Sequence, residues 1–98
     1  MNPHALVLSD NGQTLYVSNW ASDSVSVIDV GTLRVTGRIP VGDNPNDMAL
    51  SKDGRLFVSC SNDNSVVVID TKTRQVIERI STALTTPMSP SSNRVALP

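Results

Sequence analysis

The side chains that could do chemistry in this sequence are few and widely spaced. His4 is the only histidine and Cys60 the only cysteine among the 98 residues, so the sequence offers neither a multi-histidine metal site nor an internal disulfide. It contains no G-x-S-x-G nucleophile motif and no glycine-rich phosphate loop. The segments DNG (10–12) and NDN (62–64) carry oxygen ligands but lack the alternating acidic positions of a calcium loop. We therefore predict no catalytic, cofactor-binding or metal-binding residues.

Composition narrows the remaining classes of function. The eight basic residues are scattered and the net charge is -1, which argues against a nucleic-acid partner. No apolar run reaches 18 residues, so no membrane span is predicted. The opening MNPHALVLSD lacks the basic and apolar regions of a secretory signal. With 39% apolar and 17% charged residues, the chain is expected to fold, around a small core.

The strands and turns that would position any functional site occur in two similar copies along the chain. The stretch LYVSNWASDSVSVID (15–29) returns as LFVSCSNDNSVVVID (56–70). Gly12 and Gly54 lie 42 residues apart, whereas later equivalent positions lie 41 apart, which we attribute to Thr14 as an extra residue of the first copy. A period of about 40 residues that holds four short strands is typical of a β-propeller blade. No segment keeps apolar residues at helical spacing over three turns.

The predicted fold class is all-β: propeller blades made of two four-stranded antiparallel meander sheets, plus the start of a third blade. Asp29 and Asp70 are expected to accept bonds from turn amides near Thr32 and Thr73. We divide the chain into blade 1 (1–42), blade 2 (43–82), and a Ser/Thr/Pro-rich crossover (83–98) in which a truncated third blade begins near Arg94. The expected strands are 5–9, 15–18, 24–30, 34–39, 47–51, 56–60, 65–70 and 75–80.

The two copies resemble the YVTN-type β-propeller repeat. The motif appears as YVSN (16–19) and, less faithfully, as FVSC (57–60), and the link IPVGDNP (39–45) is similar to the I-x-V-G-x-x-P junction of that family. The resemblance extends from residue 2 to about residue 84, where ISTA (80–83) replaces the junction. It implies that the chain is a fragment of a closed ring of roughly seven blades, a fold common in exported or cell-surface proteins of bacteria and archaea. The members that this resemblance brings into view include surface-layer proteins and relatives of lactone-hydrolysing propellers.

In a propeller, the first strand of each blade lines the central channel, and its entrance loop shares a rim with the loop between the second and third strands. Loops of several blades converge there, so this rim is the expected ligand site. Trp20 could anchor a partner or cover the blade edge, and Cys60 is expected to be semi-buried. The predicted binding rim is His4, Trp20, Asn44, Asn46 and Asp47, and Asn2, Asn19 and Cys60 are expected nearby.

Two functions of different class fit these observations. The first is a non-catalytic propeller module that acts as a binding or structural scaffold, with a protein or glycan partner, in an exported or surface protein. The second is part of an enzyme, which would be either lactonase-like or a propeller fused to a phosphoesterase domain. The phosphoesterase option comes from the segment ISTAL (80–84), which resembles the sequence of bacterial propellers that precede such a domain. Exposed blade faces are also expected to make the isolated chain self-associate. The ligand, the number of blades, the localisation and the oligomeric state stay open.

Overall fold

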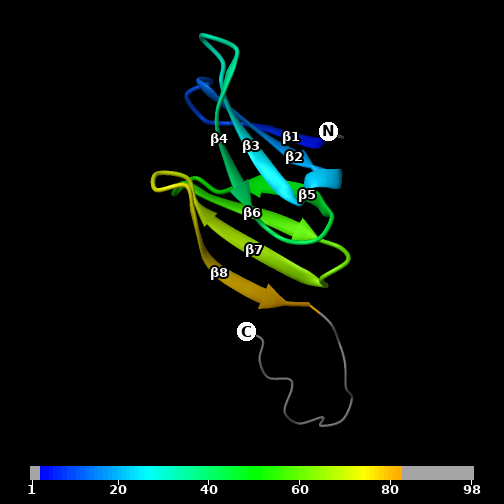
Figure 1. Cartoon of the computed structure of the whole chain (residues 1–98). Helices are drawn as coiled ribbons and strands as arrows, with labels where there is room; N and C mark the ends of the chain where they lie inside the picture. The colour runs from blue at the N-terminus through cyan, green and yellow to red at the C-terminus, as the bar shows by residue number, and fades with distance from the viewer. Residues whose placement is uncertain (1–2, 83–98) are drawn as a thin grey trace, which may run out of the picture.

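The described residues form two four-stranded antiparallel sheets joined by one short link (Figure 1). The structure is a computed structural model of the chain and describes residues 3–82. Each sheet is a meander whose strands follow one another in chain order, which confirms the predicted all-β fold. The elements are β1 (Pro3–Leu8), β2 (Thr14–Asn19), the 3₁₀ turn η1 (Trp20–Ser22), β3 (Ser24–Asp29), β4 (Arg34–Pro40), β5 (Pro45–Leu50), β6 (Arg55–Cys60), β7 (Ser65–Asp70) and β8 (Gln75–Ser81).

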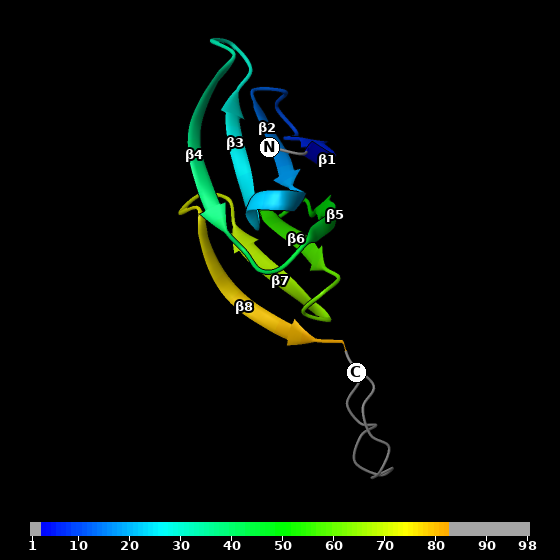
Figure 2. The same cartoon turned by 45° about the vertical axis from the view of Figure 1, so that its right-hand side comes forward.

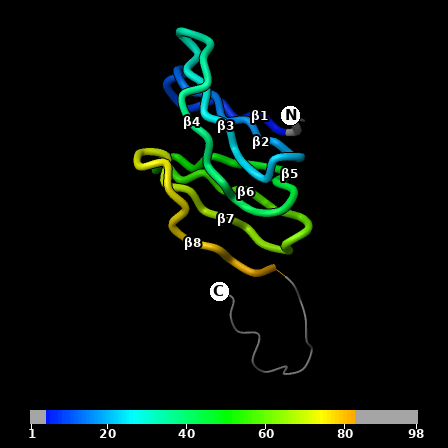
Figure 3. The backbone as a smooth tube through the Cα atoms, in the orientation of Figure 1, coloured from blue at the N-terminus to red at the C-terminus, as the bar shows by residue number. Residues whose placement is uncertain are grey.

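The two sheets lie against each other like neighbouring blades. Strand β5 contacts both β1 and β2, so the first strands of the two sheets are neighbours, while β4 and β8 lie on the opposite side (Figures 2 and 3). All eight predicted strands are present, with ends shifted by no more than two residues. The predicted crossover and third blade (83–98) lie outside the described residues. Within residues 3–82, no helix has the length and apolar character needed to cross a membrane.

The first turn of each sheet depends on a glycine. Gly12 has a φ of 73° and Gly54 a φ of 87°, values that residues with a Cβ atom rarely adopt. The extra residue of the first copy is Gln13, not Thr14 as the sequence suggested, because Thr14 opens β2 at the register position that Arg55 holds in β6. The insertion therefore stays inside the turn, and the strand pairing is unaffected.

The third turn of each sheet is tied to the aspartate before it. Asp29 Oδ2 accepts hydrogen bonds of 2.9 Å from both the amide and the hydroxyl of Thr32, as predicted. In the second sheet, Asp70 Oδ1 accepts a 2.9 Å bond from the turn amide of Lys72, the residue before Thr73, which also agrees with the prediction. The carboxylates thus satisfy turn amides that the strand ladders leave unpaired.

The core lies between the two sheets. Alternate residues of each strand point to one side of a sheet, so Tyr16, Val25 and Val27 face the second sheet while Leu56 and Val58 face the first. Full burial of a Val, Leu or Ile side chain contributes about 1.5–3 kcal/mol, which makes this layer the main source of stability. We call it the inter-sheet core. Its buried members are Tyr16, Val25, Val27, Ile39, Val41, Leu56, Val58, Cys60, Val67 and Ile69.

The other side of each sheet is turned away from its neighbour. Several large apolar side chains are exposed there, with 64% for Leu6, 52% for Val35 and 44% for Ile80. Apolar residues on both sides of a sheet are expected when the sheet is sandwiched between others. The first outer face comprises Leu6, Leu8, Leu15, Val17, Ile28 and Val35, and the second comprises Ala49, Phe57, Ser59, Val66, Val68 and Ile80.

Candidate functional site

Polar side chains gather at two rims of the paired sheets, and the two rims are built differently. The first, which we call the link rim, contains the β2–β3 loop, the β6–β7 loop and the link 41–44 between the sheets. Asp23 accepts bonds from the link on its carbonyl, from Val41 N at 3.0 Å, and on its carboxylate, from Asn44 N at 3.3 Å. Asp63 Oδ2 accepts a 2.9 Å bond from Asp43 N. Both carboxylates therefore hold the link in place.

A residue of the second sheet, on β8, also holds the link in place. Arg79 Nη1 donates a 2.5 Å bond to the carbonyl of Val41. Gly42 has a φ of 156°, and a Cβ atom there would lie 2.6 Å from Asp63 Oδ2 and 3.4 Å from Cys60 Sγ. No side chain fits at this position without displacing its neighbours.

Cys60 is more deeply buried than predicted. It is 1% exposed and belongs to the inter-sheet core, because its strand position faces the first sheet. Burial, followed by the nearby Asp63 carboxylate, raises the pKa of the Cys60 thiol above its ordinary value. A buried, protonated thiol is a packing group and a poor nucleophile.

The five residues of the predicted binding rim lie at one end of the two sheets. Trp20 opens η1 and is 43% exposed, while Asn44 directly precedes β5 with a φ of 57°. Asn46 is half-buried and Asp47 is exposed, both on β5. His4 lies on β1, and its side chain is outside the described part of the molecule. Whether these residues bind a ligand stays a prediction.

Asp47 sits in a hollow that the sequence did not indicate. Its backbone amide donates a 3.2 Å bond to Ser59 Oγ, and its side chain lies on the second outer face because Asp47 pairs with Ser59 in the ladder. The hollow has a volume of about 280 Å³ and is lined by Asp47, Met48, Ala49, Phe57, Ser59 and Val66. Asp47 is therefore as much a residue of the sheet face as of the rim.

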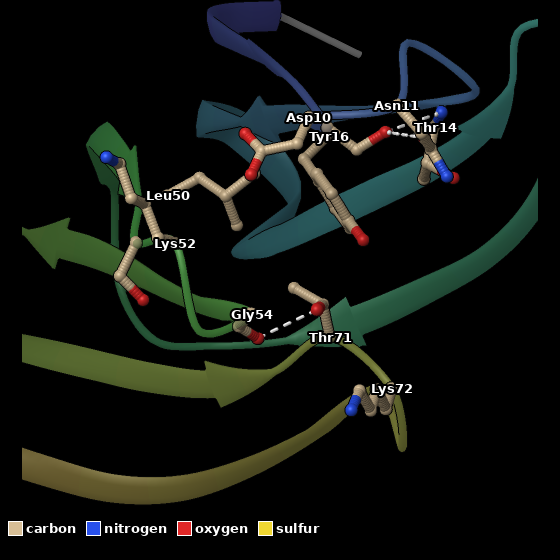
Figure 4. A pocket seen from close by; sticks show the side chains of 11 residues that line it. Asp10, Asn11, Thr14, Tyr16, Leu50, Lys52, Gly54, Thr71 and Lys72 are labelled. Carbon is tan, nitrogen blue, oxygen red and sulfur yellow. Dashed lines mark hydrogen bonds between the residues drawn. The ribbon is translucent and has the colours of Figure 1, made fainter.

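The opposite rim, which we call the glycine-turn rim, holds a larger cavity between the sheets (Figure 4). Its volume is about 380 Å³, within the range of small-molecule sites. The sequence placed the expected ligand site at the other rim and did not indicate this cavity. A signal was present, since the repeat changes from Phe57 to Tyr16 at this place. The lining residues are Ser9, Asp10, Asn11, Thr14, Tyr16, Leu50, Ser51, Lys52, Gly54, Thr71 and Lys72.

Beside this cavity, the turn of the second sheet is braced by charged side chains. The Ser51 hydroxyl and then Arg55 hold the pKa of the Asp53 carboxyl below its usual value. Arg55 Nε lies 3.0 Å from Asp53 Oδ2, and the Arg55 guanidinium lies 5.4 Å from the centre of the Phe57 ring. The pair is exposed to solvent, so it orders the turn and adds little stability.

Comparisons with known proteins agree with this architecture. A family model described as "Lactonase, 7-bladed beta-propeller" matches residues 2–89. Antigen Lp49 of Leptospira interrogans is 35% identical, in a match that covers 79% of this chain and 20% of that protein. The chain thus spans about a fifth of the length of this curated relative.

Solved structures show the same pair of sheets. A chain of hydrazine synthase from Kuenenia stuttgartiensis superposes with a TM-score of 0.80 at 32% identity, covering 84% of this chain and 24% of that one. AztD from Citrobacter koseri gives a TM-score of 0.71 at 18% identity, over 81% of this chain and 24% of that one, which shows likeness of fold alone. Together with the duplicated four-stranded sheets, the family match establishes that the chain belongs to the lactonase family of 7-bladed β-propellers.

Proposed function

We propose that the chain supplies two successive blades of a propeller and acts as a non-catalytic binding or structural scaffold. The observation that supports this proposal is that polar groups of the link rim form hydrogen bonds within the protein itself. Asp23 and Asp63 bond the link between the sheets, and the Asn44 carbonyl accepts a 3.1 Å bond from Ser61 N. Groups committed to structural bonds have little freedom to transfer protons. In residues 3–82, moreover, no three His, Cys, Asp or Glu side chains gather as metal ligands would.

Within this proposal, the exposed part of the link rim meets a protein or glycan partner. Trp20 is 43% exposed, and exposed tryptophan is a frequent anchor in interfaces. The parent would be an exported or surface protein with YVTN-type repeats, a reading supported by YVSN (16–19) on β2 and by the relative described as an antigen.

The partner proposal is tested on a glycan array, with the 98-residue chain as the probe. Trp20→Ala should abolish binding to any glycan that the unchanged chain retains. Leu33→Ala is the matched control, because Leu33 is 80% exposed but lies in the β3–β4 turn, away from the link rim. No retained glycan, or equal losses in both variants, would argue against a glycan partner at Trp20.

A second candidate function is part of a lactone-hydrolysing enzyme, and the family match over residues 2–89 favours it. Asn44, Asn46 and Asp47 would then line a pocket at the channel mouth, whose opposite wall would come from further blades. We expect the 98-residue chain alone to show no turnover of lactones or phosphoesters. If the complete protein hydrolyses a lactone and Asp47→Ala or His4→Ala removes that activity, the scaffold proposal fails.

Self-association of the isolated chain is part of the same proposal. Both outer faces expose apolar side chains, such as Leu6 at 64% and Ile80 at 44%, and these faces are built to be covered. Sedimentation should show oligomers that Leu6→Lys shifts toward monomer, while Leu33→Lys leaves them unchanged. A cooperatively folded monomer at all concentrations would contradict this expectation.

A further inference from the structure

We propose that the cavity at the glycine-turn rim is a binding site for a small polyhydroxylated anion, such as a sugar acid or a sugar phosphate. The cavity of about 380 Å³ has both of its walls in this chain, one from each sheet. A site at the channel mouth would need further blades to close it. This inference concerns the opposite rim and does not depend on the proposed function.

Tyr16 is the first reason to assign a ligand here. The side chain is 5% exposed and its ring is part of the inter-sheet core. Figure 4 shows its hydroxyl pointing into the space between the Asn11 turn and Thr71, and none of the described residues forms a hydrogen bond with it. The hydroxyl oxygen is not among the enclosed, unpaired polar atoms of the described residues, so it opens into the cavity, where it can bond a group that enters.

The internal repeat has a phenylalanine at the position equivalent to Tyr16. Phe57 holds the equivalent position in the second sheet, where it pairs with Val68 as Tyr16 pairs with Val27. The same blade position is thus built with and without the oxygen. Of these two positions, only Tyr16 lines the cavity, and only Tyr16 carries a hydroxyl group.

The turns around the cavity are held rigid by their own hydrogen bonds. Asn11 Oδ1 accepts bonds from Ser9 Oγ at 2.7 Å and from Gln13 N at 3.0 Å, which leaves the Asn11 amide group as a donor. Thr71 Oγ1 donates a 2.7 Å bond to the carbonyl of Gly54 and keeps its lone pairs as acceptors. Donors and acceptors fixed in this way bind hydroxyl groups with little loss of entropy.

Charge selects the class of ligand. Three of the lining residues are charged, the lysines Lys52 and Lys72 and the aspartate Asp10, so basic residues outnumber acidic ones in the lining. Lysine is a common point-charge partner of phosphate and carboxylate groups. The Asp10 carboxylate, like the Tyr16 hydroxyl and the Asn11 amide, pairs with hydroxyl groups. A monosaccharide with one anionic group satisfies both sets of partners.

The test is a titration of the ¹⁵N-labelled 98-residue chain with glucuronate and with glucose 6-phosphate, followed by NMR. The expected result is saturable shifts of amides in the two glycine turns for at least one of the two, which also identifies the preferred anionic group. Glucose and inorganic phosphate should bind at least tenfold more weakly. Absence of saturable shifts, or inorganic phosphate binding as tightly as glucose 6-phosphate, would overturn the proposal.

Variants separate this site from general charge effects. Tyr16→Phe installs the residue that the second sheet already uses, so the fold should be kept while affinity falls roughly fivefold, the worth of one net hydrogen bond. Lys52→Gln with Lys72→Gln should weaken binding roughly tenfold or more. Arg34→Gln with Arg38→Gln removes the same charge outside the cavity and should have little effect, as should Trp20→Ala. Unchanged affinity in Tyr16→Phe would refute the assignment.

Discussion

The inter-sheet core and the outer faces are made from equivalent positions of one repeat, yet they have become different surfaces. Leu56 is fully buried, while Leu15, its counterpart 41 residues earlier, is only half-buried. Ile39 is 4% exposed and its counterpart Ile80 is 44% exposed. In these two pairs the difference in burial follows from whether a second sheet lies against the position, although Val17 and Val68 on the outer faces are buried as well.

The same comparison holds for polar positions. Asn19 and Ser26 lie on the outward side of the first sheet, where the second sheet has Cys60 and Val67 in the inter-sheet core. Asn19 Nδ2 donates a 2.6 Å bond to Ser26 Oγ, and among the described residues Asn19 Oδ1 is buried without a partner. Equivalent positions of the repeat thus form a polar cluster in the first sheet and part of the apolar inter-sheet core in the second.

The largest expected difference in stability is between alanine variants of Leu56 and of its repeat counterpart Leu15. Leu56→Ala should lower the free energy of unfolding by about 2–5 kcal/mol, because it leaves a cavity in the inter-sheet core. Leu15→Ala should cost less than half as much, since its site is only half-buried and can refill with water. Urea unfolding of both variants measures the difference. Equal losses would mean that the outer face is as tightly packed as the inter-sheet core.

The link provides the next contrast. Gly42→Ala should destabilise the pair of sheets by about 1–3 kcal/mol, because its φ is 156° and the new Cβ would lie 2.6 Å from Asp63 Oδ2. Gly31→Ala is the control, since its Cβ would meet only Asp29 Oδ2 at 3.5 Å, and should change stability by no more than about 0.5 kcal/mol. A thermal unfolding midpoint unchanged by Gly42→Ala would show that the link tolerates rearrangement.

A smaller effect is expected from paired arginines. Arg79 and its counterpart Arg38 are both exposed, but of the two only Arg79 has a hydrogen bond within the described residues, from Nη1 to the carbonyl of Val41 in the link. Arg79→Ala should cost about 1–2 kcal/mol, the worth of a charged hydrogen bond, and Arg38→Ala about 0.5 kcal/mol at most. Chemical denaturation of both variants measures the two losses in unfolding free energy. Similar losses would show that the bond from Arg79 to the link adds no stability.

The smallest effect is a pH dependence from the inter-sheet core. The folded-state pKa of Cys60 is raised by burial, so its contribution is fully present below the ordinary thiol pKa of about 8.5. It is lost as the pH rises through that value toward the folded-state pKa. Unfolding free energies of the unchanged chain should therefore fall more between pH 7 and pH 10 than those of Cys60→Ala. Parallel curves would contradict a buried thiol.

Much of the fold could be predicted because its signals are local. The alternation of apolar residues, the turns at Gly12 and Gly54 and the carboxylate of Asp29 act over a few residues, and the structure has strands and turns at these places. The error in the first turn was also local. The extra residue of the first copy is Gln13 rather than Thr14, because a turn can absorb one residue without changing the strands beside it.

The candidate site was predicted less well. The sequence placed Trp20 and Asn44 at the same end of the sheets, as the order of strands requires. It did not show that Asp23 and Asp63 would be committed to the link, since these contacts join residues about twenty positions apart. It also missed the cavity beside Tyr16, because a cavity is a property of two surfaces and a sequence pattern describes one segment at a time.

The sequence by itself determined the duplicated four-stranded sheet, because hydrogen-bonded strands and tight turns follow from residue type and spacing within about 40 residues. Only the tertiary structure decided which side of each sheet became core. Leu15 and Leu56 carry the same side chain at the same place in the repeat, and the difference in their burial comes from contact with the neighbouring sheet. The cavity between the glycine turns arises from that contact as well.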